Sequence, residues 1–222
     1  MKSLALVALL LAGCAGDLVE PWELDHDRIV AIRATPPRMP ADASSALEVL
    51  LAHEGAATTA RAPDSVEVVS PAILTSAVAG ATVTAPSESQ LAAARTELGL
   101  AANAPVPLVL SVGANGFLAT KTVWLGETAA NPSLAEVLVD GTSPTEALVL
   151  PAATEVRLSV PAVDGVDNIT WMTSCGTMHD FDLSHAYLRI EPEDSQEGEL
   201  VLVVRDPRGG VSWRVWPVRA AP

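Results

Sequence analysis

The densest group of side chains that could bind a metal lies between Cys175 and His185. Four of them are potential ligands: Cys175, His179, Asp182 and His185. Thiolate, imidazole and carboxylate groups all bind zinc or copper, so a metal-binding or metal-dependent protein is one hypothesis. We prefer a structural role, because strand alternation places Cys175 on the same face as Trp171 and predicts a small buried thiol. We therefore expect no resident metal and no cofactor.

Other catalytic and ion-binding motifs are weak or missing in the sequence. The acidic residues from Asp180 to Glu191 have the spacing of a calcium-binding EF-hand loop, but His185 stands where that loop needs glycine. The sequence contains no Gly-x-Ser-x-Gly elbow, no phosphate-binding glycine loop and no Cys-x-x-Cys pair. This pattern predicts a protein that is not an enzyme.

Tryptophan is the other residue type that could make a site, and it accounts for five of the eight aromatic residues. Trp213 and Trp216 are three residues apart, so in a strand they face opposite sides. Trp124 and Trp216 match across 92 residues. If both are partly exposed, such a pair is a possible contact for a protein or a glycan, but packing between the modules is the preferred interpretation. Trp22 is expected to pack against the first module.

The elements that must position these side chains are short β-strands separated by turn residues. The expected strands are residues 28–34, 46–53, 66–70, 107–112, 119–125, 136–139, 155–160, 168–174, 186–191, 199–205 and 211–218. A short helix is expected near residues 88–98, because Ser87 and Gln90 have the spacing of a capping box at its start. The pattern predicts an all-β fold with one inserted α-helix.

An internal repeat organises these strands into two units. Two pairs of segments match at an offset of 92: 108–112 with 200–204, and 123–124 with 215–216. The beginnings of the two units match at an offset of 107, so the first unit holds about fifteen extra residues. The helix near 88–98 would supply them. The repeat predicts one module over residues 27–128 and a second over 133–220.

The end of the chain resembles bacterial immunoglobulin-like and PKD-type domains. In those domains a valine-rich strand leads into an Asp-x-x-Gly-Gly turn, which here is residues 206–210 between the strands at 199–205 and 211–218. Trp171 would lie mid-strand, as the core tryptophan of such a sandwich does. The resemblance implies two tandem Ig-like β-sandwich modules.

The N-terminus contains a second resemblance. A short basic segment and eight apolar residues precede Leu11-Ala12-Gly13-Cys14, which resembles the lipobox of bacterial lipoproteins. This implies a signal peptide over 1–13, acylation of Cys14 and a lipidated tether over 14–26. Ala15, rather than aspartate, follows the cysteine, which implies sorting to the outer membrane. An ordinary secretory signal is the alternative.

Composition limits the partners. Lys and Arg number 13 against 27 Asp and Glu, a net charge of −14, which disfavours nucleic acid. The whole chain resembles predicted lipoproteins of GC-rich Gram-negative bacteria, a resemblance that implies no activity. We therefore expect a lipid-anchored cell-envelope protein at the outer membrane with a non-catalytic binding or structural role. Its expected partners are the membrane, through acyl chains, and an envelope protein or glycan, with the face of the membrane left open.

Overall fold

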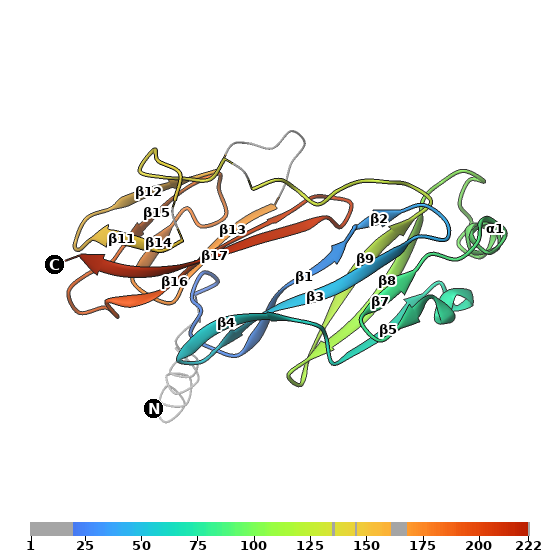
Figure 1. The fold of residues 1–222 in the computed structure, drawn as a ribbon, viewed down its shortest axis with the longest axis horizontal. Helices are drawn as coiled ribbons and strands as arrows, with labels where there is room; N and C mark the ends of the chain where they lie inside the picture. Colours follow the sequence, from blue (N-terminus) through green and yellow to red (C-terminus); the bar gives the residue numbers. More distant parts are fainter. Residues whose placement is uncertain (1–19, 135, 145, 161–167, 222) are drawn as a thin grey trace, which may run out of the picture.

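The computed structural model describes residues 20–134, 136–144, 146–160 and 168–221, which fold into two β-sandwiches (Figure 1). We call them the first module, which contains β1 to β9, and the second module, which contains β10 to β17. The predicted signal peptide and the predicted acylation site Cys14 lie outside the described residues. No helix in the described part of the chain is long and apolar enough to cross a membrane.

The first module consists of two facing sheets. One has the order β1 (Arg28–Thr35), β3 (Ser44–His53), β7 (Thr82–Thr84), β6 (Val78–Ala79), with β4 (Ala56–Arg61) also paired to β3. The other has the order β2 (Arg38–Met39), β9 (Phe117–Leu125), β8 (Val106–Ala114), β5 (Ser65–Ser70). All pairs are antiparallel except β2 with β9. Alternate residues of the strands form the core between the sheets, for example Leu108 and Leu110.

The second module has the same topology. One sheet has the order β10 (Leu138–Val139), β12 (Val156–Ser159), β15 (His185–Arg189), β14 (Thr177–His179). The other has the order β11 (Leu148–Pro151), β17 (Val211–Ala221), β16 (Glu197–Arg205), β13 (Asn168–Thr173). Here too the short strand beside the last strand is parallel, as β2 is to β9. The prediction of an all-β chain with two tandem Ig-like sandwiches is confirmed.

The inserted helix distinguishes the two modules. Helix α1 (Glu88–Glu97) lies in the connection from β7 to β8, which spans residues 85–105, whereas residues 190–196 alone join β15 to β16. The side-chain oxygen of Gln90 accepts a hydrogen bond from the Ser87 N–H at 3.2 Å, as expected of the capping box. Leu91 and Ala94 pack into the core of the first module. The short 3₁₀ helix η1 (Ala72–Ala77) follows β5.

The two modules share an apolar interface. The outward faces of β1 and β3 pack against the outward faces of β13, β16 and β17. The buried residues of this interface are Leu24, Val30, Ala31, Leu50, Ala52, Met172, Val201, Val203 and Val211. Because β16 is covered on both faces, residues 200–204 form an unbroken apolar run instead of alternating with polar residues. We call this interface and the polar contacts beside it the module joint.

Candidate functional site

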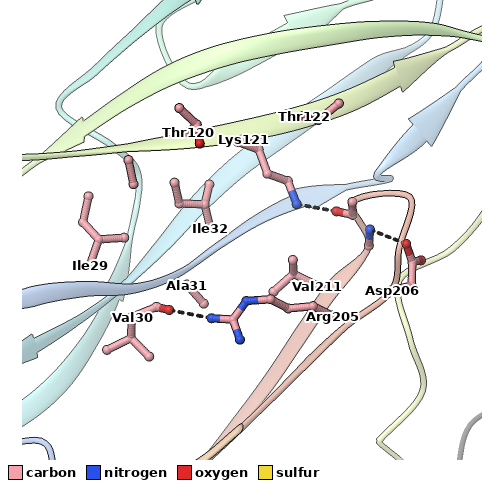
Figure 2. Close-up of a pocket in the computed structure, with 13 residues that line it drawn as sticks. Ile29, Val30, Ala31, Ile32, Thr120, Lys121, Thr122, Arg205, Asp206 and Val211 are labelled. Carbon is pink, nitrogen blue, oxygen red and sulfur yellow. Dashed lines mark hydrogen bonds between the residues drawn. The ribbon is translucent and has the colours of Figure 1, made fainter. Parts of the chain in front are cut away.

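The polar part of the module joint is built around Lys121. This residue lies on β9, and its ammonium group donates a hydrogen bond to the carbonyl of Gly209 in the turn between β16 and β17 (Figure 2). The side chain is 5% exposed. Gly209 has a φ of +84°, and a Cβ there would lie 2.6 Å from the backbone oxygen of Thr122. The turn therefore needs glycine to approach β9 this closely.

Asp206 holds this turn in shape and joins it to the first module. One of its oxygens accepts hydrogen bonds from the N–H groups of Arg208 at 2.7 Å and Gly210 at 2.9 Å. The other forms an ion pair with Arg38 of β2 at 2.7 Å. Glu127, which follows β9, adds an ion pair to Arg208 at 3.3 Å. The Asp-x-x-Gly-Gly turn thus makes several of the polar contacts between the modules.

The linker between the modules is fixed to both of them. The side-chain amide of Asn131 donates to the Ala34 carbonyl of β1 at 2.8 Å, and its oxygen accepts from the Val211 N–H of β17 at 2.9 Å. The Ser212 hydroxyl donates to the Pro132 carbonyl at 2.6 Å. A single amide side chain therefore connects the first strand of one module to the last strand of the other.

A pocket of about 270 Å³ lies inside the joint, between β1, β9 and the β16–β17 turn (Figure 2). Its walls combine apolar residues 29–32 of β1 with Lys121, Arg205 and Asp206. The guanidinium of Arg205 donates to the Val30 carbonyl at 2.8 Å. Burial lowers the pKa of Lys121 to about 8, an effect that Asp206 opposes and Arg205 increases. Burial also lowers the pKa of Arg205.

The predicted metal ligands do not come together. Cys175 is 3% exposed in the core of the second module, whereas His179, Asp182 and His185 lie on the surface. Among the described residues, no three His, Cys, Asp or Glu side chains are placed to share a metal ion. Burial raises the pKa of the Cys175 thiol, which disfavours the thiolate that would bind metal. The predicted burial of Cys175 beside Trp171 is confirmed.

This placement gives a mutational test of the metal alternative. Replacing Cys175 by alanine should lower the free energy of unfolding by about 1 kcal/mol, because it removes one buried atom and leaves a small cavity. Replacing His179 or His185 by alanine should change it by less than about 0.5 kcal/mol, since both are exposed. Chemical denaturation of each variant measures these values. A strong loss from either histidine, or a chelator-induced fall in Tm, would support a metal site instead.

The tryptophans differ from their predicted placement. Trp216 is 1% exposed in the core of the second module, so this residue serves neither as an exposed contact nor as packing between the modules. Its position on β17 directs the Trp216 side chain between the two sheets. Trp213, three residues earlier, lies on the opposite face of the same strand. Trp213 packs at the module joint, and the Arg33 guanidinium of β1 lies 3.9 Å from its ring centroid. Trp124 is half-buried on β9 and keeps some exposed surface.

Trp22 also lies in the second module, so the expectation that it packs against the first is wrong. The segment around it extends the sheet at the edge of β13: the Thr173 N–H donates to the Trp22 carbonyl and the Leu24 N–H to the Thr173 carbonyl, both at 2.9 Å. This pairing directs the Trp22 side chain into the core beside Cys175. Leu24 points the other way, into the module joint. The segment around Trp22 thus pairs with β13, the edge strand of this sheet.

Comparisons with known proteins identify no family for the chain. No protein-family model matches it, and neither does any curated protein. Among solved structures, the D0–D1 domain of intimin is 17% identical with a TM-score of 0.28, covering 87% of this chain and 96% of that one. Extracellular domains 3–5 of Drosophila OTK are 12% identical with a TM-score of 0.33, and the match covers 89% of this chain and 62% of that one. Fibronectin(III)-like modules of Clostridium thermocellum CbhA are 11% identical with a TM-score of 0.30, covering 86% and 94%. At these values the similarities carry no inference about function.

Proposed function

We propose that the chain is a lipid-anchored cell-envelope protein of the outer membrane with a non-catalytic role, binding an envelope protein or glycan or serving as a structural element. The observation that carries the proposal is the docked tether. Trp22 is buried in the second module and lies eight positions after Cys14 of the lipobox. An extended chain spans at most about 3.5 Å per residue, so acylation of Cys14 would hold Trp22 within roughly 28 Å of the lipid surface.

The module joint supports a structural or scaffolding role. Apolar packing, the Arg38–Asp206 ion pair and the Asn131 amide fix one sandwich against the other. A rigid joint and a docked tether together would set the orientation of both modules relative to the membrane. The half-buried ring of Trp124 remains a candidate contact for a protein or glycan partner.

The polar side chains of the described part support a role without catalysis. Two hydroxyl–imidazole pairs occur among the described residues. Ser184 and His185 are hydrogen-bonded at 3.0 Å, but they are sequence neighbours, and no described carboxylate is bonded to this imidazole. Thr59 and His53 are 2.8 Å apart, but the nearest Asp27 oxygen is 3.9 Å from the other ring nitrogen, beyond hydrogen-bond distance. A nucleophile is normally activated by a base that a third group orients. The buried Cys175 thiol has a raised pKa and is a poor nucleophile.

The anchor has a direct test. Replacing Cys14 by serine should abolish incorporation of labelled palmitate and release the protein from the membrane fraction or leave an uncleaved precursor, because the acylated thiol is lost. Cys175→Ala is the matched control and should still be labelled, since it removes the other cysteine of the chain. A wild-type protein that takes up no label would instead indicate an ordinary secretory signal. Density-gradient separation of the membranes would then test sorting, with Ala15→Asp expected to move the protein to the inner membrane.

A further inference from the structure

The pocket in the module joint contains two cations that form no ion pair with any described residue. Lys121 and Arg205 both line it, and their hydrogen bonds go to uncharged groups: the Gly209 and Val30 carbonyls and, from Arg205, the Thr170 hydroxyl. In the part of the chain that the structure describes, neither forms an ion pair. A charge taken out of water is costly unless an opposite charge accompanies it.

Among the described residues, one carboxylate lines the pocket, and it is already engaged. Asp206 forms its ion pair with Arg38 and accepts two backbone hydrogen bonds within its own turn. It also attracts the nearby Lys121 ammonium group. The described charged residues of the lining are therefore two cations, from β9 and β16, and one anion that is shared with a third cation, Arg38. Residues 29–32 of β1 contribute no titratable side chain. The described lining thus has more positive than negative charge, in a chain whose net charge is −14.

The size and walls of the pocket limit what could supply the missing negative charge. Its volume of about 270 Å³ is below the usual range of roughly 300–1,000 Å³ for ligand sites. At about 30 Å³ per water-sized group, it has room for a ligand on the order of nine such groups. Ile29, Ile32 and Val211 line it together with the cations. An ion with a hydrocarbon part matches these walls better than a fully hydrated anion does.

We propose that this pocket binds a small aliphatic carboxylate, with the carboxylate group held between Lys121 and Arg205 and the hydrocarbon part against Ile29, Ile32 and Val211. The ligand would lie between the modules and contact both of them, because β1 and β9 belong to the first and the turn after β16 belongs to the second. This site is independent of the membrane anchor, so its test and that of lipidation can fail separately.

The NMR signal of Lys121 itself can report whether a carboxylate binds in the pocket. Lysine occurs at positions 2 and 121 only, so removal of the signal peptide leaves one lysine in the chain. In protein labelled with ¹³C at lysine Cε and held in mild detergent, the resonance that Lys121→Met removes should titrate with a pKa of about 8, whether or not the segment with Lys2 has been cleaved. Saturating isovalerate should raise this pKa by at least one unit. By linkage, isovalerate should then bind about tenfold more tightly at pH 7 than at pH 10.

Matched ligands and variants decide the outcome. Isovaleramide has the same shape without the charge and should leave the pKa unchanged. Lys121→Met should weaken isovalerate binding at least tenfold, whereas Arg219→Met, at an exposed position of β17 that does not line the pocket, should leave it unaltered. Circular dichroism checks that each variant folds. If a variant does not fold, the titration of the wild-type protein still tests the proposal. No pKa change at 50 mM isovalerate, or an equal change with inorganic phosphate, would overturn the proposal.

Discussion

Replacing Val203 by aspartate should separate the unfolding of the two modules. Val203 is 0% exposed on the outward face of β16, where it packs against the first module. An unpaired carboxylate there would cost about 4 kcal/mol or more, unless the modules part and let water reach it. The core of the second module lies on the other face of β16 and keeps its residues Leu200 and Leu202. In calorimetry we expect one transition for the wild type and two, at lower temperature, for Val203→Asp.

The control and a second variant make this result specific to the joint. Val149→Asp places the same charge on β11, where the side chain is 59% exposed, and should change stability by less than about 0.5 kcal/mol. Leu50→Asp approaches the same interface from β3 of the first module and should reproduce the split transition. If Val203→Asp and Leu50→Asp both unfold in a single transition at the wild-type temperature, the shared interface does not couple the modules.

The strands that could be predicted are those with a clear apolar pattern. The segments expected at 107–112 and 199–205 are β8 and β16, and the repeat that relates them reflects equivalent positions in two sheets of the same order. The apolar pattern does not predict the strand β4 (Ala56–Arg61), because its residues are exposed or half-buried and no apolar alternation marks it. It forms a hairpin with β3 through the two-residue turn Glu54-Gly55, and the glycine of that turn, with a φ of +65°, was the local signal that could have found it.

The module joint was beyond sequence-based prediction. From the sequence alone, a lysine such as Lys121 is expected to be a solvated surface charge. It is buried because the β16–β17 turn lies over β9. One signal was available: the unbroken apolar run at 200–204 indicates a strand covered on both faces. It does not say which surface covers the second face. The spacing of Cys175 and His185 also could not reveal that the thiol lies in the core while the imidazole lies on the surface.

Replacing Trp22 by alanine should lower the free energy of unfolding of the second module by about 3–5 kcal/mol. The ring is 9% exposed in that core, although the residue precedes every strand of the first module. Its loss would leave a large cavity next to Cys175 and weaken the pairing of the tether with Thr173. Chemical denaturation measures the stability, and in the Cys14→Ser background the reaction of Cys175 with a thiol reagent should become much faster.

Two variants of the same segment separate the role of the ring from that of the tether as a whole. Trp22→Phe keeps an aromatic side chain in the core and should cost on the order of 1–2 kcal/mol. Asp25→Asn alters an exposed side chain of the same segment and should change stability by less than about 0.5 kcal/mol. Because the tether is held by Trp22, Trp22→Ala should also make the bonds around residues 20–27 sensitive to protease. If Trp22→Ala leaves both stability and Cys175 reactivity unchanged, the tether does not dock on the second module, and the distance limit that it sets between this module and the membrane is lost.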